Sequence, residues 1–194
     1  MSSKPPPPPA QADKVPAEAT RDGVTGLADR HHLDLVLPGL LASATQSEQA
    51  LALVWLQLDG LAGVRQRYGD AAGVALLQSF GELLSKQSRA EDAACRCGDD
   101  VFCLALPGMD AHTARRKFNA LLAWWRSAEF QFDAGTSNGH GFSAGIVDTF
   151  LLAGGAAEML VAAQSCLAEA TRLGRGRVLV YDAVAFDTES LDTS

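Results

Sequence analysis

Acidic and basic side chains gather in residues 89–107, which read RAEDAACRCGDDVFCLALP. Asp99 and Asp100 form a polar turn between two apolar segments, and carboxylates in such a turn could hold divalent cations. Arg89 and Asp92 stand just ahead of the turn. An arginine fork can bind an anion such as a phosphate through two parallel hydrogen bonds, and a carboxylate can accept from N–H donors. The stretch therefore contains groups that could bind a metal ion or a polar ligand.

Each of these groups also has a purely structural interpretation. Arginine and aspartate three positions apart are often a solvated surface pair that contributes about 0–1 kcal/mol. Cys95, Cys97 and Cys103 fall in the same stretch. Strong zinc sites pair C-x-x-C elements, so we interpret these thiols as buried and reduced. We interpret His31 and His32 as surface residues rather than metal ligands.

Composition limits the classes of partner. The formal net charge of −7 argues against a non-specific DNA binder and against a protein that binds anionic membranes, because both attract positive surfaces. The sequence contains no run of about 18 apolar residues, so we expect no membrane insertion. The first ten residues, MSSKPPPPPA, lack the apolar core of a secretion signal, and we expect a cytoplasmic protein.

The same composition divides the chain into one domain and two tails. Residues 1–20 contain five consecutive prolines and little apolar surface, so we predict a disordered, Pro-rich tail. Residues 21–184 form the predicted domain, and 47% apolar residues in the whole chain are enough for a sizeable core. Residues 185–194 are a short acidic tail.

Strand and helix patterns alternate within the domain. The apolar run 50–59 is typical of a strand covered on both faces. Further strands are predicted over residues 93–97, 101–107, 139–148 and 177–182. Helices are predicted over residues 29–46, 69–87, 110–128 and 154–174. This order predicts an α+β fold with a central, mainly antiparallel five-stranded sheet flanked by helices.

The predicted helices have recognisable inward faces and ends. In the helix over 69–87, one stripe comprises Ala72, Leu76, Phe80 and Leu83. In the helix over 110–128, the stripe comprises Ala114, Phe118, Leu121 and Trp125. Asp110 is placed to cap the start of that helix, and Pro38 is expected to bend or interrupt the first helix.

The ordered motifs between about residues 22 and 182 resemble the GGDEF domain, the diguanylate cyclase fold. DGVTGLADRHHLD is similar to the family's opening D-x-L-T-G-L-x-N-R, RCGDDVFCLALP to RYGGDEFxxLLP, and FSAGIVD to the xSIGVA strand. The resemblance implies a palm-like sheet with the signature turn at its active edge. It also implies synthesis of cyclic di-GMP from two GTP molecules, with two metal ions held by carboxylates on adjacent strands.

Several positions depart from the catalytic pattern. The metal carboxylate of the first strand falls on Gln57, whose neutral amide cannot supply that charge. Asp59 lies on the same face about 6–7 Å further along, and could substitute only if the ion moved. The second signature glycine is Asp99 and the fourth-position acid is Val101, whereas the third-position acid remains as Asp100.

The positions that contact substrate depart as well. The guanine-reading asparagine and its partner aspartate fall on Arg65 and Val74, and a late phosphate-binding lysine falls on Thr171, although Arg175 is kept. Each lost charged or bidentate contact is worth about 1–3 kcal/mol, and about 1.4 kcal/mol is a factor of ten in rate. We therefore predict a catalytically inactive domain and expect neither a cofactor nor Mg²⁺.

The family's product-inhibition motif, R-x-x-D, is in register, because Asp92 precedes the signature turn at the family's offset. We predict that Arg89 and Asp92 bind cyclic di-GMP without metal. Arg115 and Arg116, on the helix after the turn, are predicted to add phosphate contacts. The family's further arginine on that helix falls on Ala120.

These observations lead to three hypotheses of function. The first is a non-catalytic cyclic di-GMP receptor that signals through an unidentified protein partner, or through a homodimer bridged by the ligand. The second is a protein-interaction module that has lost both nucleotide sites. The third is a weak residual diguanylate cyclase that uses Asp59 and Asp100.

Overall fold

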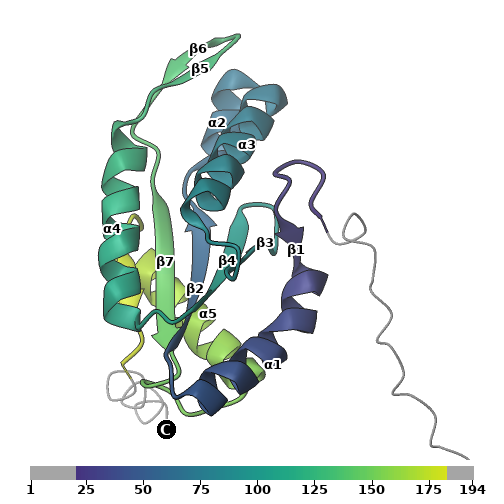
Figure 1. Ribbon diagram of the computed structural model, residues 1–194. Helices are drawn as coiled ribbons and strands as arrows, with labels where there is room; N and C mark the ends of the chain where they lie inside the picture. The colour runs from purple at the N-terminus through teal and green to yellow at the C-terminus, as the bar shows by residue number, and fades with distance from the viewer. Residues whose placement is uncertain (1–20, 183–194) are drawn as a thin grey trace, which may run out of the picture.

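The computed structural model describes residues 21–182, and the predicted tails 1–20 and 185–194 lie outside the described residues. A six-stranded sheet in the order β1-β3-β4-β2-β7-β8 forms the centre of the domain, with helices on both faces (Figure 1). The strands of this sheet are β1 (Ala28–Asp29), β2 (Leu51–Leu58), β3 (Ala93–Arg96), β4 (Val101–Pro107), β7 (Phe142–Asp148) and β8 (Val178–Val180). The helices are α1 (Arg30–Ser47), α2 (Leu61–Tyr68), α3 (Asp70–Gln87), α4 (Ala111–Ser127) and α5 (Ala156–Arg172). The α+β prediction is confirmed.

The predicted count of five strands is wrong. The central strands pair antiparallel, β3 with β4, β4 with β2 and β2 with β7, whereas β8 joins β7 in parallel. The sixth strand, β1, has two residues and pairs in parallel with β3. Two residues carry no alternating pattern, so sequence periodicity could not reveal this strand. A separate hairpin of β5 (Phe130–Phe132) and β6 (Gly135–Ser137) was also not predicted.

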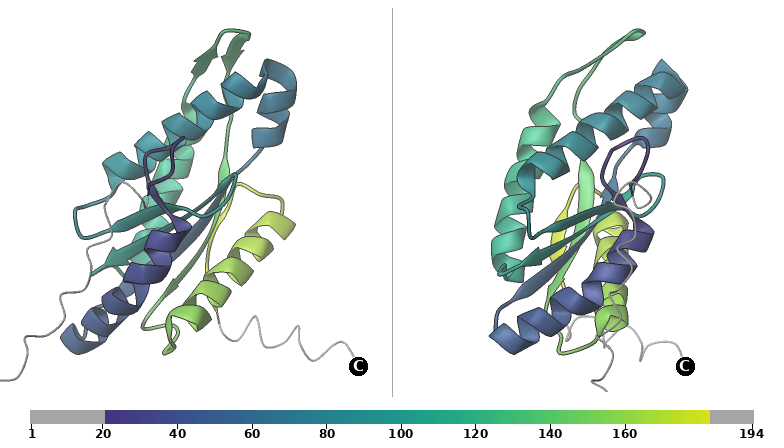
Figure 2. Two further views of the ribbon diagram at one scale, coloured as in Figure 1. Left: turned by 90° about the vertical axis from the view of Figure 1, so that its right-hand side faces the viewer. Right: turned by 45° about the vertical axis from the view of Figure 1, so that its right-hand side comes forward.

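Side-chain alternation along β2 divides the interior into two layers. Ala52, Val54 and Leu56 face α3 and α4, whereas Leu51, Leu53 and Trp55 face α1 and α5. Figure 2 shows α1 and α5 on one side of the sheet and α3 and α4 on the other. Seven of the eight β2 residues, all except Gln57, are buried, as expected of a strand covered on both faces.

The helices follow their predicted stripes with two differences. All eight stripe residues predicted for α3 and α4 are buried, and the Asp110 carboxylate caps α4 by accepting from the Thr113 N–H at 2.8 Å. Pro38 does not interrupt α1, which runs through it without a break. The short α2 was not predicted from the sequence; Gly60 adopts φ +79° and turns the chain directly from β2 into this helix.

Gly145 lets α5 lie directly on β7. A Cβ atom at this position would overlap the Ala163 carbonyl oxygen and the Leu167 amide nitrogen. The close approach fixes α5 against the centre of the sheet, opposite the layer formed by α3 and α4.

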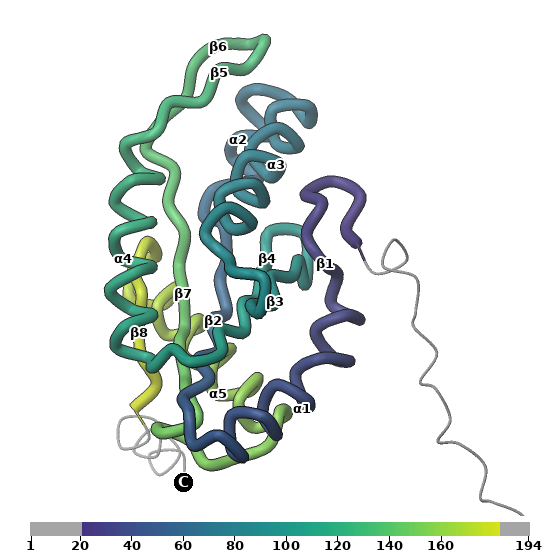
Figure 3. The backbone as a smooth tube through the Cα atoms, in the orientation of Figure 1, coloured from purple at the N-terminus to yellow at the C-terminus, as the bar shows by residue number. Residues whose placement is uncertain are grey.

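One end of the sheet gathers the chemistry-bearing segments. The β3–β4 turn, the end of β2 and the segment 21–27 meet there, as the backbone tube shows (Figure 3). The Leu58 N–H donates to the Asp100 carbonyl at 2.8 Å, and Arg96 reaches Asp22. Within residues 21–182, no helix combines the length and apolar character needed to cross a membrane.

Candidate functional site

Arg96 stabilises the β3–β4 turn by donating hydrogen bonds to its backbone. The Cys97 and Gly98 N–H groups both donate to the Val101 carbonyl, at 2.8 and 3.1 Å, which closes the turn tightly. The Arg96 guanidinium donates to the Gly98 and Asp99 carbonyls at 3.0 and 2.6 Å. Its side chain is only 10% exposed, so the turn has a rigid base.

Asp22 anchors Arg96 on the neighbouring segment. Arg96 Nη1 donates to both Asp22 carboxylate oxygens, at 3.0 and 3.1 Å, and the Thr25 N–H and hydroxyl donate to the same carboxylate at 2.7 Å. Burial alone would raise the pKa of Asp22, but the hydrogen bonds from Thr25 and Arg96 outweigh it and hold the pKa below its ordinary value. The opening motif and the signature turn thus form one unit.

Gln57 and Asp100 contact each other directly at the active edge. Gln57 lies opposite Val101 in the β2–β4 register, and its Nε2 donates to Asp100 Oδ2 at 3.1 Å. An amide donor therefore lies against the Asp100 carboxylate, and Val101 offers no ligand atom. Hard cations such as Mg²⁺ need several oxygen ligands with negative charge. These residues do not fit the pair of metal ions that the resemblance implied.

Arg65 and Asp99 form a second pair across the same corner. Arg65 Nη1 and Nη2 donate to the two Asp99 oxygens at 2.6 and 2.9 Å, which is the bidentate geometry of strong arginine–carboxylate pairs. The hydrogen bonds from Arg65 hold the pKa of Asp99 below its ordinary value. Gly73 makes room for the Arg65 stem, since a Cβ there would lie 2.5 Å from Arg65 Cγ. Arg65 and Asp99, which both depart from the family pattern, therefore form an ion pair with each other.

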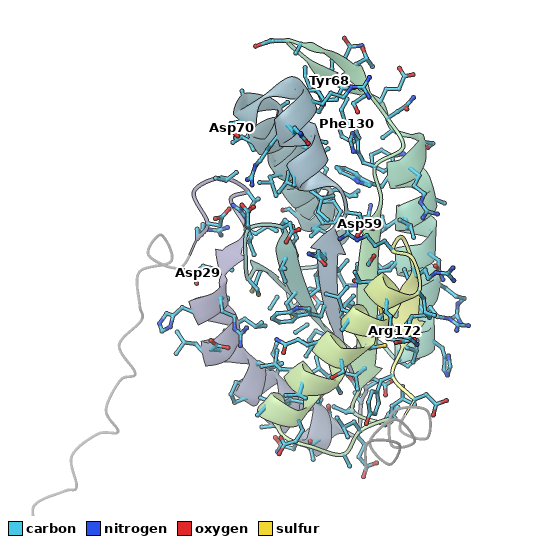
Figure 4. The ribbon with its side chains drawn as sticks, turned by 180° about the vertical axis from the view of Figure 1, so that it is seen from behind. Asp29, Asp59, Tyr68, Asp70, Phe130 and Arg172 are labelled. Atoms are coloured by element: carbon cyan, nitrogen blue, oxygen red, sulfur yellow. The ribbon has the colours of Figure 1, made fainter. Side chains whose placement is uncertain are left out.

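Asp59 belongs to a different network. Its carboxylate accepts from the Ser143 hydroxyl at 3.1 Å and from the Gly176 N–H at 3.0 Å. Burial raises the pKa of Asp59, and these bonds together with Arg175 and Arg126 only partly offset the effect. Figure 4 shows Asp59 beyond the end of β2, far across the molecule from Asp29 at the start of α1. Asp59 therefore ties β7 to the loop before β8.

The structure brings Arg89 and Asp92 to one polar cavity of about 280 Å³. The Arg89 N–H donates to Asp92 Oδ2 at 2.8 Å, and the Asp92 N–H donates to the Arg89 carbonyl at 3.2 Å. Among residues 21–182, the Arg89 guanidinium has an ion pair with exposed Glu91, with a 3.7 Å separation, rather than with Asp92. The backbone of the motif is therefore fixed, while the guanidinium is held only loosely.

Arg115 and Arg116 are not among the residues that line this cavity. Both are exposed on α4, and Arg116 donates to the Thr113 hydroxyl at 2.9 Å. Lys117 is the α4 cation that interacts electrostatically with Asp92 and Arg89, and its ammonium donates to the Gln87 carbonyl at 2.6 Å. Burial lowers the pKa of Lys117.

Helical spacing alone could not have singled out Lys117. It is three residues after Ala114 and four before Leu121, but Arg115 is likewise three residues before Phe118, so only Arg116 falls clearly on the outer face. Two other residues that line the cavity, Arg21 and His32, had no signal in the sequence either. His31 is exposed, and His32 is half-buried where it lines the cavity.

Three of the four cysteines are buried core residues, and Cys97 is half-buried. All four are free thiols, and no group of three or more His, Cys, Asp or Glu side chains in residues 21–182 could hold a metal ion. Burial raises the pKa of Cys95 and that of Cys97 to about 12, which keeps both thiols protonated at neutral pH.

The mainly antiparallel sheet, the signature turn between β3 and β4 and the glycine-containing loop before β8 define a nucleotidyl-cyclase-like palm domain. A family model described as "Diguanylate cyclase, GGDEF domain" matches residues 19–177. The chain belongs to the GGDEF domain family. The match covers most of the chain, so the family accounts for nearly all of the described structure.

Comparisons with individual proteins agree with this membership. The chain is 32% identical over 164 residues to the probable diguanylate cyclase DgcE of Escherichia coli strain K12, covering 84% of this chain and 15% of that protein. Its fold is similar to the GGDEF domain of DgcB from Caulobacter crescentus in complex with c-di-GMP, with a TM-score of 0.79, 21% identity and coverage of 89% and 98%.

A second similar structure is the diguanylate cyclase SiaD from Pseudomonas aeruginosa in complex with its activator SiaC. Its TM-score is 0.76 at 21% identity, with 84% of this chain and 62% of that chain covered. At this identity, the two structures show a shared fold. The chain spans only a small part of the length of DgcE.

Proposed function

We propose that this GGDEF domain binds cyclic di-GMP at the Arg89–Asp92 cavity without making it, and acts as a receptor that signals through a protein partner. The observation that carries the proposal is a contrast between two corners of the domain. At the corner where the resemblance places catalysis, the polar side chains form hydrogen bonds and ion pairs with one another. At the Arg89–Asp92 corner, polar side chains line an open cavity.

The catalytic corner is closed by two internal pairs. Gln57 donates to Asp100, and Arg65 holds Asp99 in a bidentate pair between α2 and the turn. By the resemblance, these are positions where metal ions and the guanine of GTP would be held. Binding GTP there would break both pairs and would find no second metal carboxylate, and losses of several kcal/mol correspond to many orders of magnitude in rate.

The Arg89–Asp92 corner is preorganised for a ligand. Asp92 Oδ2 accepts from the Arg89 N–H, which fixes the carboxylate and leaves Oδ1 for guanine N1–H and N2–H₂. The Arg89 side chain is 59% exposed and its 3.7 Å contact with Glu91 is worth little, so the guanidinium can turn toward a guanine edge at small cost. The complex of DgcB with c-di-GMP supports this ligand for the fold.

A protein-interaction module is the second candidate. Among the described residues, the most exposed large apolar side chains are Phe150 at 68%, Val161 at 61% and Trp124 at 57%. The complex of SiaD with its activator supports a protein partner for a domain of this fold. The two candidates differ in whether any nucleotide binds.

Calorimetric titration and thermal unfolding with cyclic di-GMP, cyclic di-AMP and GTP, each with and without Mg²⁺, test the proposal. We expect cyclic di-GMP to bind with a micromolar or lower Kd independently of Mg²⁺, and Arg89→Ala to abolish binding. Arg67→Ala, which removes an exposed arginine of α2, is the matched control and should bind like wild type.

The other results identify the alternatives. Equal binding by Arg89→Ala would remove the site assignment. Absence of any nucleotide response would favour the interaction module. Slow Mg²⁺-dependent conversion of GTP to cyclic di-GMP, lost in Asp100→Ala, would establish a residual cyclase.

A further inference from the structure

The Arg89–Asp92 cavity has a second wall that comes from the N-terminal part of the domain. Arg21 and His32 line it, although they are 68 and 57 positions before Arg89 in the sequence. We propose that Arg21 and His32 contact the phosphate of the bound nucleotide, in place of Arg115 and Arg116. This inference rests on the proposed function, since it assigns the phosphate contacts of the same cavity.

Arg21 is held in place by backbone pairing at the sheet edge. It forms an isolated antiparallel bridge with Ala28, and the adjacent Asp22 N–H donates to the Leu27 carbonyl at 2.8 Å. Arg21 Nη1 donates to the Gly26 carbonyl at 2.8 Å, which orients the guanidinium. Its remaining N–H groups have no hydrogen-bond acceptor among residues 21–182, so they can donate to a phosphate.

His32 is positioned by the start of α1. The Asp29 carboxylate, which caps this helix, accepts from the His32 N–H at 2.9 Å. The imidazole is half-buried and borders the cavity, where either ring nitrogen could serve as a donor to a phosphate oxygen. Within residues 21–182, neither ring nitrogen of His32 takes part in a hydrogen bond or an ion pair.

The residues that line the cavity carry a small net positive charge, in a protein whose formal net charge is −7 and in which Glu91 pairs with Arg89. Arg21 and Arg89 line it, and Lys117 interacts electrostatically with Arg89 and Asp92, the one carboxylate of the lining. A local excess of positive charge within low-dielectric walls concentrates anions. Arg89 and Asp92 suit the guanine edge, so the second wall is left for the phosphate.

The size of the cavity limits how much ligand enters. A volume of about 280 Å³ is at the lower end for ligand sites, which usually span about 300–1,000 Å³. One nucleotide unit of the cyclic dinucleotide fits this volume better than the whole molecule does. The second unit would then extend out of the cavity toward solvent or a partner.

Titration of full-length variants with cyclic di-GMP tests the inference. We expect Arg21→Gln and His32→Ala each to raise Kd by about 10- to 100-fold, the usual effect of losing a hydrogen bond to a charged group. Arg21→Gln keeps a donor for the Gly26 carbonyl while removing the charge, and thermal unfolding of each variant verifies folding. The double variant Arg115→Ala/Arg116→Ala is the control and should bind like wild type.

A second probe separates phosphate from base recognition. The ratio of GMP to guanosine affinity should fall in Arg21→Gln, because only GMP carries the phosphate. If wild type binds cyclic di-GMP and the Arg21 and His32 variants bind equally well, this inference is overturned while the proposed function stands. A loss confined to the Arg115/Arg116 variant would overturn it too. If wild type binds no cyclic di-GMP, the proposed function fails first.

Discussion

Replacing Gln57 by glutamate would restore an acid where the family resemblance places a metal ligand. The wild-type amide donates to Asp100 Oδ2 at 3.1 Å. Glutamate has the same shape but offers no donor, so Gln57→Glu turns this hydrogen bond into a contact between two carboxylates. We expect the variant to be less stable than wild type at pH 7 and to be rescued by Mg²⁺.

The structure allows the size of this effect to be worked out. Contacting oxygens at 3.1 Å place the two charges about 4 Å apart, where like charges repel by about 4 kcal/mol at an effective dielectric constant of about 20. Loss of a hydrogen bond to a charged acceptor costs about 1.5–3 kcal/mol. Both side chains are half-buried, so solvent screening reduces the sum, and we expect the free energy of unfolding to fall by about 2–4 kcal/mol.

Chemical denaturation of wild type, Gln57→Glu and Gln57→Leu measures the effect. Leucine removes the donor without adding charge, so the difference between the two variants isolates the repulsion. Mg²⁺ at about 100 times its Kd should raise the free energy of unfolding of Gln57→Glu by about 2.7 kcal/mol. It should not stabilise wild type or Gln57→Leu. Equal stability of wild type and Gln57→Glu, with no response to Mg²⁺, would refute the proposed contact.

Three further predictions concern the surrounding framework. The Arg65–Asp99 pair is exposed enough that Arg65→Ala should cost less than about 1 kcal/mol of unfolding free energy, and a double-mutant cycle with Asp99→Ala measures the coupling. Gly145→Ala should cost about 1–3 kcal/mol or prevent folding, because the new methyl group would overlap the backbone of α5; unchanged thermal stability would contradict this packing. Asp22→Asn should cost about 1–3 kcal/mol at neutral pH, because it removes the charge partner of Arg96. The folded-state pKa of Asp22 lies below its unfolded value of about 3.9. The stability that the Asp22 carboxylate contributes is therefore present above about pH 4 and is lost as pH falls through the folded-state pKa. Denaturation at pH 7 and pH 3 should show a smaller difference in unfolding free energy between wild type and Asp22→Asn at the lower pH.

Much of the framework could be predicted because its signals are local. The apolar run of β2 indicated a strand covered on both faces, and its alternate residues do enter two separate core layers. The inward stripe of α4 and its Asp110 cap depend only on helical spacing and on hydrogen bonding within one turn. Neither requires knowledge of which segment lies opposite.

The missed elements lacked such signals. The two residues of β1 are a strand only because β3 lies beside them. The helix α2 has few buried residues, Leu61 and Val64, and so a weak apolar periodicity. Pro38 was expected to bend or interrupt α1, but tertiary packing of Leu33, Leu37 and Leu41 keeps the helix continuous.

By itself, the sequence determined the family, the layered α+β framework and the positions that depart from the catalytic pattern. It showed that Gln57 and Asp99 are unusual, but not that each has a partner. Only the tertiary structure decided that Gln57 meets Asp100 from 43 positions away and that Arg65 meets Asp99 from 34. Likewise, only the tertiary structure brought Arg21 to the Arg89 cavity. The physical reason is that these contacts join separate elements across one end of the sheet, and their geometry depends on how those elements pack.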